Sequence, residues 1–273
     1  MKDLKVAAVC MRSAPGEAER NLDRMQAFVW EAADNGADLV CFPELSVTGY
    51  TLKDRDDLYG GLSWNHAVKR LARMARQTNL VIIAGLAEPS KGPDPFITQL
   101  IVGPNGLMGL HRKTHLSPHE KEIYWAGQKI DVIPWGKARL GIQLCYEAHF
   151  PEISTLMSLK GAEILLIPHA SPRGNPGEKL KSWLRHLPAR AFDNGVFVVA
   201  CNQVGDTKEG FSFPGVALVL GPDGLILAKY AGREENILYS DLSTLLLHDV
   251  RQSRMKYFFP LRRPELYKDI SGA

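Results

Sequence analysis

Two polar residues, Glu44 and Lys113, have neighbours in the sequence that would suit them to acid–base and electrostatic catalysis. Pro43 and Glu44 come just after the apolar run Leu39 to Phe42. A carboxylate at the mouth of an apolar strand is poorly solvated, which raises its pKa and suits proton transfer. Lys113 lies in the motif HRKTHL, and a fixed ammonium can stabilise a developing oxyanion. Taken singly, each has a simpler and favoured interpretation: a helix-capping or surface-paired Glu, and a solvated Lys.

Cys145 is the candidate nucleophile. It lies in RLGIQLCYEAHFPEIS, where an apolar strand is followed by the cysteine, a short loop and a helix opened by Pro151. A side chain at such a corner faces backbone N–H groups that can hold an oxyanion, and neighbouring positive charge is expected to lower the thiol pKa from about 8.5 towards neutrality. The alternative is a buried structural cysteine, and the polar flank of Tyr146, Glu147 and His149 makes the two interpretations about equally good.

Composition excludes several classes of protein. The chain has 273 residues, 45% hydrophobic and 23% charged, with a formal net charge of +3 from mixed basic and acidic residues. This balance is typical of a soluble globular protein and gives no reason to expect a nucleic-acid or membrane partner. The four cysteines are widely spaced without a CxxC pair, so they indicate no zinc site and favour a reducing, cytoplasmic compartment. The N-terminal segment, with charges on both sides of a short apolar run, is expected to be a strand and not a signal peptide.

Strands and helices are expected to alternate along the chain. Near-continuous apolar runs predict strands covered by helices; they span Leu4 to Met11, Leu39 to Phe42, Leu80 to Leu86, Leu140 to Cys145, Ile164 to Pro168 and Val196 to Asn202. Apolar residues at helical spacing predict helices from Glu17 to a stop at Gly36, over His66 to Gln77, from Pro151 and from about Glu178. The third helix is expected to place Ile153, Leu156 and Met157 on one face, and Pro188 to interrupt the fourth.

Two similar segments predict the sheet type. ITQLIV–GPNG–LMGLHRK and GVALVL–GPDG–LILAKY each read as strand, turn and strand, one in each half of the chain. Paired hairpins favour a mixed sheet in each half over one doubly wound sheet. No linker or composition break appears, so 1–273 is expected to form a single domain. Its aromatic- and arginine-rich C-terminal tail, 250–273, is expected to pack at a subunit interface.

Read together, the segments FPELSVTGY, HRKTHLSPHEKEIYWAGQ, GIQLCYEAHFPE, ILLIPHAS and RAFDNGVFVVACNQVG resemble the signature blocks of the nitrilase, or carbon–nitrogen hydrolase, superfamily. The similarity runs from about Val6 to Tyr267 in the order and approximate spacing of that family. The resemblance implies an α/β fold, a four-layer α-β-β-α sandwich with two mixed sheets. It also implies pairing of two sandwiches, so a homodimer or higher homo-oligomer is expected.

The resemblance assigns roles to the residues singled out above. Glu44 matches the general base, Lys113 the lysine that steadies the tetrahedral intermediate, and Cys145 the nucleophile, with the backbone N–H of Tyr146 completing the oxyanion hole. A further catalytic glutamate is expected in the loop after the lysine.

Two residues compete for that fourth position, Glu120 and Glu122. Counting back from Gly127 favours Glu120. The chain departs from many relatives at Glu147, where Asp is common, and at Ala126, where Pro is common. These departures blur the subfamily and remove no catalytic group.

Substrate-binding candidates come from the nucleophile loop and from the segment after the Ile164–Pro168 run. They are Tyr146, His149, His169, Ser171 and Arg173, with Trp183 and Asn194 as further candidates. Arg173 could hold a substrate carboxylate through two hydrogen bonds, although a solvated loop arginine is the favoured interpretation. The two histidines could equally be structural. Glu147 is expected to orient its loop, and Arg190 to form a structural ion pair.

The expected activity is hydrolysis of a non-peptide carbon–nitrogen bond in a small amide or N-carbamoyl compound, through a cysteine thioester and without a metal or organic cofactor. The expected partner is this small-molecule substrate. Three alternatives remain open: a nitrilase acting on a nitrile, a glutaminase-type subunit that releases ammonia for a separate synthetase, and a catalytically silent binding protein.

Overall fold

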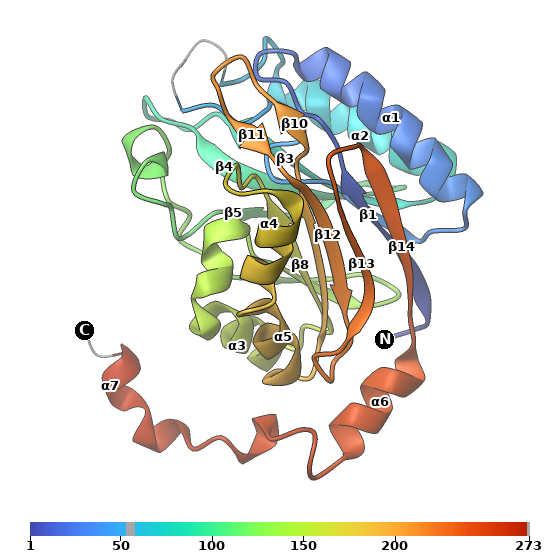
Figure 1. The fold of residues 1–273 in the computed structure, drawn as a ribbon, viewed down its shortest axis with the longest axis vertical. Coiled ribbons are helices and arrows are strands. Elements are labelled where there is room, and N and C mark those ends of the chain that lie inside the picture. Colours follow the sequence, from blue (N-terminus) through green and yellow to red (C-terminus); the bar gives the residue numbers. More distant parts are fainter. Residues whose placement is uncertain (53–57, 272–273) are drawn as a thin grey trace.

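Two mixed β-sheets lie face to face, and helices cover the outer face of each (Figure 1). The computed structural model describes residues 1–52 and 58–271. Within them, each main sheet has six strands, and the order of the first is β14-β1-β2-β3-β4-β5. These strands are β1 (Leu4–Cys10), β2 (Leu39–Cys41), β3 (Val81–Glu88), β4 (Phe96–Gly103), β5 (Gly106–Arg112) and β14 (Asn236–Leu242). The predicted α-β-β-α sandwich is confirmed.

The second sheet has the order β13-β12-β9-β8-β7-β6. Its strands are β6 (Val132–Pro134), β7 (Arg139–Ile142), β8 (Ile164–His169), β9 (Phe197–Asn202), β12 (Gly215–Leu220) and β13 (Ile226–Gly232). A short ribbon of β10 (Gly205–Asp206) and β11 (Ser212–Phe213) lies outside it. Strands β7, β8 and β9 run parallel, whereas β12 pairs antiparallel with both β9 and β13. The β4–β5 and β12–β13 hairpins are both present, which confirms the prediction from the two GPxG turns.

The alternation of side chains along each strand separates three apolar layers. On β2, Leu39 and Cys41 belong to the central core between the sheets, whereas Val40 faces the helices that cover the first sheet. Successive strand residues point to opposite faces, so a continuous apolar run is needed where both faces are buried. The inner core joins β1, β2 and β3 to β7, β8 and β9. This explains why the strand-forming runs are apolar throughout.

The helices follow the predicted order with local differences. They are α1 (Ala18–Asp34), α2 (Trp64–Thr78), α3 (Pro151–Leu159), α4 (Pro176–Trp183), α5 (Leu187–Phe192), α6 (Thr244–Gln252) and α7 (Lys268–Ser271). Helix α1 ends just before Gly36, whose φ of +70° suits glycine, and α4 and α5 are separate, with Pro188 in the first turn of α5. The placement of Leu156 was wrong. Ile153 and Met157, four residues apart, are buried, while Leu156 is 39% exposed on the solvent side of α3.

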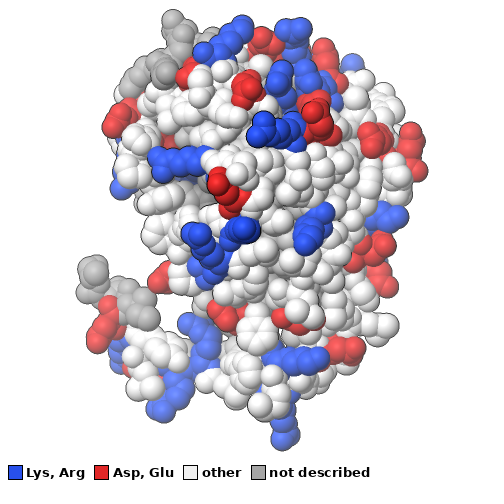
Figure 2. Space-filling view, in the orientation of Figure 1, with Lys and Arg blue, Asp and Glu red and all other residues white. Residues whose placement is uncertain are grey.

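The C-terminal segment runs away from the sandwich (Figure 1). After α6 it contains two 3₁₀ helices, η3 (Phe259–Leu261) and η4 (Pro264–Leu266), followed by α7. In the face shown in Figure 2, acidic and basic side chains are interspersed over the body. In the part of the chain that the structure describes, no helix is both long and apolar enough to span a bilayer.

The strand ends determine where the polar residues meet. Glu44 follows β2, Lys113 follows β5, Cys145 follows β7, and Ala170 follows β8. The first two strands belong to one sheet and the last two to the other. A site assembled from these residues therefore lies between the two sheets, beyond the carboxyl ends of the strands, where ligands commonly bind in α/β proteins.

Candidate active site

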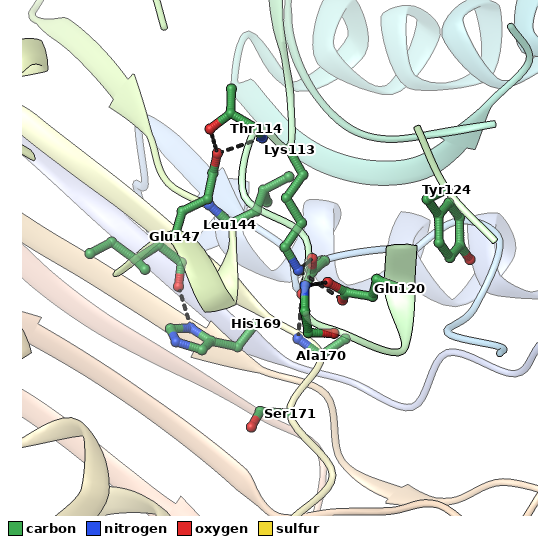
Figure 3. Close-up of polar contacts among 12 residues, drawn as sticks. Lys113, Thr114, Glu120, Tyr124, Leu144, Glu147, His169, Ala170 and Ser171 are labelled. Carbon is green, nitrogen blue, oxygen red and sulfur yellow. Dashed lines mark hydrogen bonds and ion pairs between the residues drawn. The ribbon is translucent and has the colours of Figure 1, made fainter. Parts of the chain in front are cut away.

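A buried ion cluster centres on Lys113 (Figure 3). Its Nζ donates to Oε1 of Glu44 at 2.7 Å and to Oε1 of Glu120 at 2.8 Å. The side chains of Lys113 and Glu44 are completely buried, and that of Glu120 is 4% exposed. Charges this deep are tolerated only when they are paired and hydrogen-bonded. The structure thus places Glu44, from the loop after β2, against Lys113 and Glu120, which both lie in the loop after β5.

Backbone and amide groups fix the carboxylate of Glu44. The N–H of Ala170, at the end of β8, donates to Oε2 of Glu44 at 3.0 Å. The side-chain amide of Gln203 donates to the Glu44 carbonyl at 2.9 Å, and that of Gln99 donates to the carbonyl of Phe42 at 3.1 Å. Leu45, the next residue, has a φ of +54°, an uncommon value for a residue with a side chain. The loop after β2 is therefore held in one conformation from both sheets.

The pKa of Glu44 is raised to about 7. Burial is the largest cause, the ammonium of Lys113 opposes it, and the nearby Glu120 carboxylate adds to it. For Lys113, burial disfavours the ammonium, but the two carboxylates and the Cys145 sulfur prevail and raise its pKa well above the ordinary value. Lys113 is therefore a permanent cation, while the Glu44 carboxyl can exchange a proton near neutral pH.

Glu120 begins the 3₁₀ helix η1 (Glu120–Glu122). One of its carboxylate oxygens binds Lys113, and the other accepts the N–H of Ser117 at 2.8 Å. Glu122, at the end of the same turn, is exposed. Of the two glutamates left open by the sequence, the structure places Glu120 on Lys113.

Cys145 lies at a strained corner. Strand β7 ends at Ile142, earlier than predicted, so that Gln143 and Leu144 separate it from the cysteine. Cys145 opens the 3₁₀ helix η2 (Cys145–His149) with a φ of +44°. Backbone conformations of this kind cluster at functional sites because the surroundings must enforce them. Cys145 is half-buried, whereas Cys10, Cys41 and Cys201 are buried.

The expectation of a lowered thiol pKa was wrong. The pKa of Cys145 is raised to about 12, because burial and the negative charges of Glu44 and Glu120 outweigh the positive charge of Lys113. The N–H of Ala170 faces both the sulfur and the Glu44 carboxylate. Cys145 is thus a thiol in the free protein, within the electrostatic reach of a carboxylate that can take its proton.

Glu147 connects the lysine loop to the cysteine loop. Its carboxylate accepts from Nε2 of His111 at 2.8 Å, from the N–H of Thr114 at 2.7 Å and from the N–H of Leu144 at 2.6 Å. Burial alone would raise its pKa, but His111 and the other donors lower it to about 2. Glu147 therefore fixes the residues on either side of the ion cluster and does not serve as an acid, as its position in the sequence suggested.

The predicted substrate-binding residues occupy different environments. His169 is buried, with Nδ1 2.7 Å from the carbonyl of Ile167 and its ring 4.2 Å from that of Trp183. Ser171 is half-buried, and its N–H donates to Oδ1 of Asn202 at 2.9 Å. Arg173 is exposed on the loop before α4. His169 and Ser171 flank Ala170, which contacts the ion cluster, whereas Arg173 lies farther along the loop (Figure 3).

The remaining candidates lie along the nucleophile loop and α5. Tyr146 is half-buried, and His149 is exposed, with its ring 4.6 Å from that of His186. Asn194 lies beyond the end of α5 and donates to the carbonyl of Arg190 at 2.9 Å. Arg190 was predicted to form an ion pair. Its guanidinium instead hydrogen-bonds to backbone, because Nε donates to the carbonyl of Ala148 at 2.9 Å, and this contact anchors η2.

Sequence reasoning missed the residues that support the site. Gln99, Gln203 and His111 lie within strands or beside them, and each is buried. The only signal available was a polar residue inside an apolar run, as at Gln99 in ITQLIV. Such a residue has to find a hydrogen-bond partner when it is buried, but its identity depends on the packing of the two sheets.

The fold and the site together define a class: two-sheet α/β proteins with a half-buried cysteine near a buried ammonium and two carboxylates. The carbon–nitrogen hydrolase family model matches residues 5–252. The chain therefore belongs to the carbon–nitrogen hydrolase family.

Individual relatives agree with this assignment. The chain is 29% identical to a nitrilase of Pyrococcus abyssi, over 97% of this chain and 99% of that protein. It is 28% identical to an omega-amidase of Xenopus tropicalis, over 96% and 95% of the two chains. The crystal structure of an amidase from Nesterenkonia sp. matches with a TM-score of 0.83 at 26% identity, covering 98% of this chain and 96% of that one. A mutant of that amidase shows covalent addition of the acetamide moiety of fluoroacetamide at its active site cysteine.

Proposed function

We propose that this protein hydrolyses the carbon–nitrogen bond of a small amide or N-carbamoyl compound, with Cys145 as nucleophile, Glu44 as general base and Lys113 as the cation that stabilises the tetrahedral intermediate. The observation that carries the proposal is the ammonium of Lys113 held at 2.7 Å and 2.8 Å between two carboxylates, in electrostatic contact with a half-buried thiol. A solvated lysine and a structural cysteine would not need this arrangement.

Acylation begins from a neutral thiol. Glu44 takes the proton of Cys145 as the sulfur attacks the amide carbon, and the carbonyl π electrons move to oxygen. Lys113 and the backbone N–H of Tyr146 stabilise the oxyanion, and losing one such donor commonly costs about 3 kcal/mol in the barrier. The carbon–nitrogen bond then breaks, and Glu44 gives its proton to the departing ammonia or amine. The product of this half-reaction is a thioester.

Deacylation reverses the roles. Glu44 removes a proton from water as the water oxygen attacks the thioester carbon, and the second tetrahedral intermediate uses the same donors. When the carbon–sulfur bond breaks, the sulfur recovers its proton from Glu44. The pKa of Glu44 near 7 suits a group that must accept and donate a proton in each half-reaction. In this scheme Glu120 keeps Lys113 in position.

The substrate lies against residues that follow the nucleophile and strand β8. Tyr146, His149, His169, Ser171 and Arg173 are the proposed lining. The half-buried Tyr146 and Ser171 lie next to catalytic groups along the chain, whereas Arg173 and His149 are at the surface. We assign the first two to the pocket wall and the last two to its entrance.

A nitrile is the second candidate substrate, because one relative is a nitrilase. The same thiol attack on a nitrile carbon would give a thioimidate in place of the tetrahedral oxyanion. A panel of primary amides, N-carbamoyl compounds and nitriles, assayed for ammonia release, separates the two. Turnover of nitriles alone would replace the amide proposal, and reactivity with none would favour a silent binding protein.

The decisive experiment changes the nucleophile. Cys145→Ala is expected to reduce ammonia release below detection while leaving the melting temperature within a few degrees, because the substitution removes one atom from a half-buried side chain. Intact-mass analysis of the wild type, quenched during turnover, is expected to show an acyl adduct that maps to the Cys145 peptide. Adducts on the peptides of Cys10, Cys41 or Cys201, or full activity in Cys145→Ala, would reject this mechanism.

A further inference from the structure

A cavity outside the ion cluster lies between the loop after β1, the first turn of α1 and the β10–β11 ribbon, which are neighbours at one end of the sandwich (Figure 1). Its volume is about 390 Å³, which is in the range of pockets that hold small ligands. Lys113, Glu120 and Cys145 do not line it. It adjoins the ion cluster through Gln203, which lines the wall and donates to the Glu44 carbonyl at 2.9 Å. The cavity is therefore separate from the catalytic groups and next to them.

Ser13 is buried in the wall of this cavity, with 2% of its surface exposed. Its Oγ has no hydrogen-bond partner in the part of the chain that the structure describes. Asn21 fixes the loop that contains Ser13, because its Nδ2 donates to the carbonyls of Ala14 at 2.8 Å and Val47 at 2.9 Å. A hydroxyl buried without a partner is costly, so Ser13 is expected to bind a polar group that enters the cavity.

The N-terminus of α1 faces the same cavity. The N-cap residue Glu17 and the first-turn residue Arg20 both line the wall, and no side chain among the described residues caps this helix of 17 residues. The first N–H groups of a helix have no partner within it, and together with the helix dipole they favour a negative charge. This end of α1 therefore favours an anion in the cavity.

The carboxylates on the wall leave room for such an anion. Four basic and three acidic side chains line the cavity: Arg12, Arg20, Arg24 and Lys208, with Glu17, Asp206 and Glu209. Arg20 donates to Glu17 at 2.8 Å, and Thr51 donates to Glu209. Both of these carboxylates therefore already have a donor, and Asp206 is exposed, where water and salt screen its charge.

Arg12 supplies a cation that has no acidic partner. Its guanidinium forms no hydrogen bond or ion pair within residues 1–52 and 58–271, although its backbone N–H donates to Glu235 at 2.8 Å. The guanidinium packs against Gly205, where an added Cβ would lie 2.7 Å from Nε and 2.9 Å from Nη2. A planar guanidinium with unused N–H groups matches the oxygens of a phosphate or a carboxylate.

We propose that this cavity binds a small organic oxyanion, whose oxygens accept from Oγ of Ser13, from the guanidinium of Arg12 and from the first N–H groups of α1. A phosphate ester is the favoured ligand, because three separate sets of donors suit a group with three terminal oxygens, and helix N-termini commonly bind phosphate. The site needs no turnover at Cys145, so it stands independently of the proposed hydrolysis.

The test measures binding to the whole protein by calorimetric titration at constant ionic strength. The probes are glycerol 3-phosphate, glycerate and glycerol, which share a three-carbon skeleton and differ in the anionic group. The wild type is expected to bind the phosphate, to bind glycerate more weakly and to show no heat of binding with glycerol. Ser13→Ala and Arg12→Gln are each expected to raise the Kd for the phosphate about tenfold, as for the loss of one charge-assisted hydrogen bond.

The melting temperature of Ser13→Ala separates a binding role from a structural one. Without the anion, it is expected to equal or exceed that of the wild type, because the substitution removes an unpaired buried hydroxyl. Glycerol 3-phosphate is expected to raise the wild-type melting temperature as its concentration increases, and to raise that of Ser13→Ala less. A clearly lower melting temperature of Ser13→Ala without the anion, together with an unchanged Kd, would show that the hydroxyl only supports the fold.

Two control variants locate the bound anion. Arg73→Gln changes an exposed arginine on α2, outside the cavity, and is expected to keep the wild-type Kd. Cys145→Ala is expected to keep it as well, because Cys145 does not line the cavity. Loss of binding in Cys145→Ala would place the anion in the catalytic centre and overturn the proposal, as would an unchanged Kd in both Ser13→Ala and Arg12→Gln. Tighter binding of glycerate than of the phosphate would support an oxyanion site and overturn the choice of a phosphate ester.

Discussion

The pKa of Glu44, the proposed general base, predicts the pH range in which the protein is active. Burial raises this pKa to about 7, and in the proposed mechanism the base form accepts the thiol proton. We expect kcat/KM to fall as the pH drops below about 7, by about tenfold per pH unit. The Cys145 pKa of about 12 predicts no further rise from thiolate formation between pH 7 and about 9. A pH–rate profile measured with one amide substrate tests the fall on the acid side and the absence of a thiolate-dependent rise.

The matched variant for this profile is Glu44→Gln, which keeps the shape of the side chain and cannot accept a proton. Its activity is expected to be lost at every pH, whereas Glu122→Gln, on the exposed side of the same site loop that contains Glu120, should keep the wild-type profile. An acid limb near pH 4, or one that persists in an active Glu44→Gln, would contradict the role of this carboxyl.

The carboxylate of Glu147 links pH to the stability of the fold. Its pKa is about 2 in the folded protein and about 4.3 in an unfolded chain. The folded state therefore binds fewer protons, so about 3 kcal/mol of stability is fully present above pH 4.3 and disappears as the pH falls towards 2. We expect Glu147→Gln to lose at least this much at pH 7, with a smaller difference from wild type at lower pH.

Urea unfolding at a series of pH values checks this expectation, with the exposed Glu152→Gln on α3 as the control. If the wild-type and Glu147→Gln curves stay parallel between pH 6 and pH 3, the hydrogen bonds from His111, Thr114 and Leu144 do not depend on the charge of Glu147.

For single residues, the sequence predicted which side chains form the site better than it predicted their pKa values. Glu44, Lys113 and Cys145 could be selected because each follows an apolar strand and matches a motif. The raised thiol pKa could not be predicted, because it depends on two carboxylates that approach only in the folded chain. The cavity beside Ser13 gave no signal either, since its wall combines the loop after β1, the start of α1 and the β10–β11 ribbon.

Among the elements, the turn after Lys113 depends on Gly127. The N–H of Gly127 donates to the Lys113 carbonyl at 2.8 Å, and a Cβ added there would lie 2.3 Å from the carbonyl oxygen of Arg112. We expect Gly127→Ala to destabilise the protein by about 1–3 kcal/mol. We also expect kcat to fall by at least about tenfold, because the backbone of Lys113 must move.

Gly136→Ala is the control, because a Cβ at Gly136 would meet nothing within 4 Å. Urea unfolding and kcat measured for both variants test the prediction. Wild-type kcat in Gly127→Ala would show that the loop can shift without moving the ammonium.

The boundaries of elements were harder to predict than their order. Strand β7 ends at Ile142, although the apolar run continues to Leu144, because Gln143 and Leu144 turn to meet β8 and Glu147. The interruption between α4 and α5 followed from the chemistry of Pro188. The exposed Leu156 shows that apolar spacing alone does not tell which side of a short helix faces the core.

For the molecule as a whole, the two hairpins were sufficient to predict two mixed sheets, but the pairing of β14 with β1 was not visible, since these strands lie at opposite ends of the sandwich sequence. The role of 250–273 at a subunit interface stays a prediction. Its apolar side chains are prominent: Met255 is 78% exposed, Leu261 72% and Leu266 62%. Surfaces of this kind commonly mark interaction sites.

We expect the double change Leu261→Asp and Leu266→Asp to reduce the molecular mass of the assembly in solution, measured by light scattering during size-exclusion chromatography. Leu225→Asp, at an exposed turn outside the tail, is the control. An unchanged mass in the double variant, when the wild type is an oligomer, would show that the tail is not needed for assembly.

The pairing of β14 with β1 has a consequence for synthesis on the ribosome. All seven residues of β1 are paired with β14, from Leu4 with Leu242 to Cys10 with Asn236. Strand β1 therefore leaves the exit tunnel long before β14 and has to wait for it. Until then the backbone N–H and C=O groups on this edge of β1 are unpaired, and such an edge can associate with other chains. Nascent chains that stall before residue 236 should accordingly depend on chaperones, although every proposed catalytic side chain has already been translated.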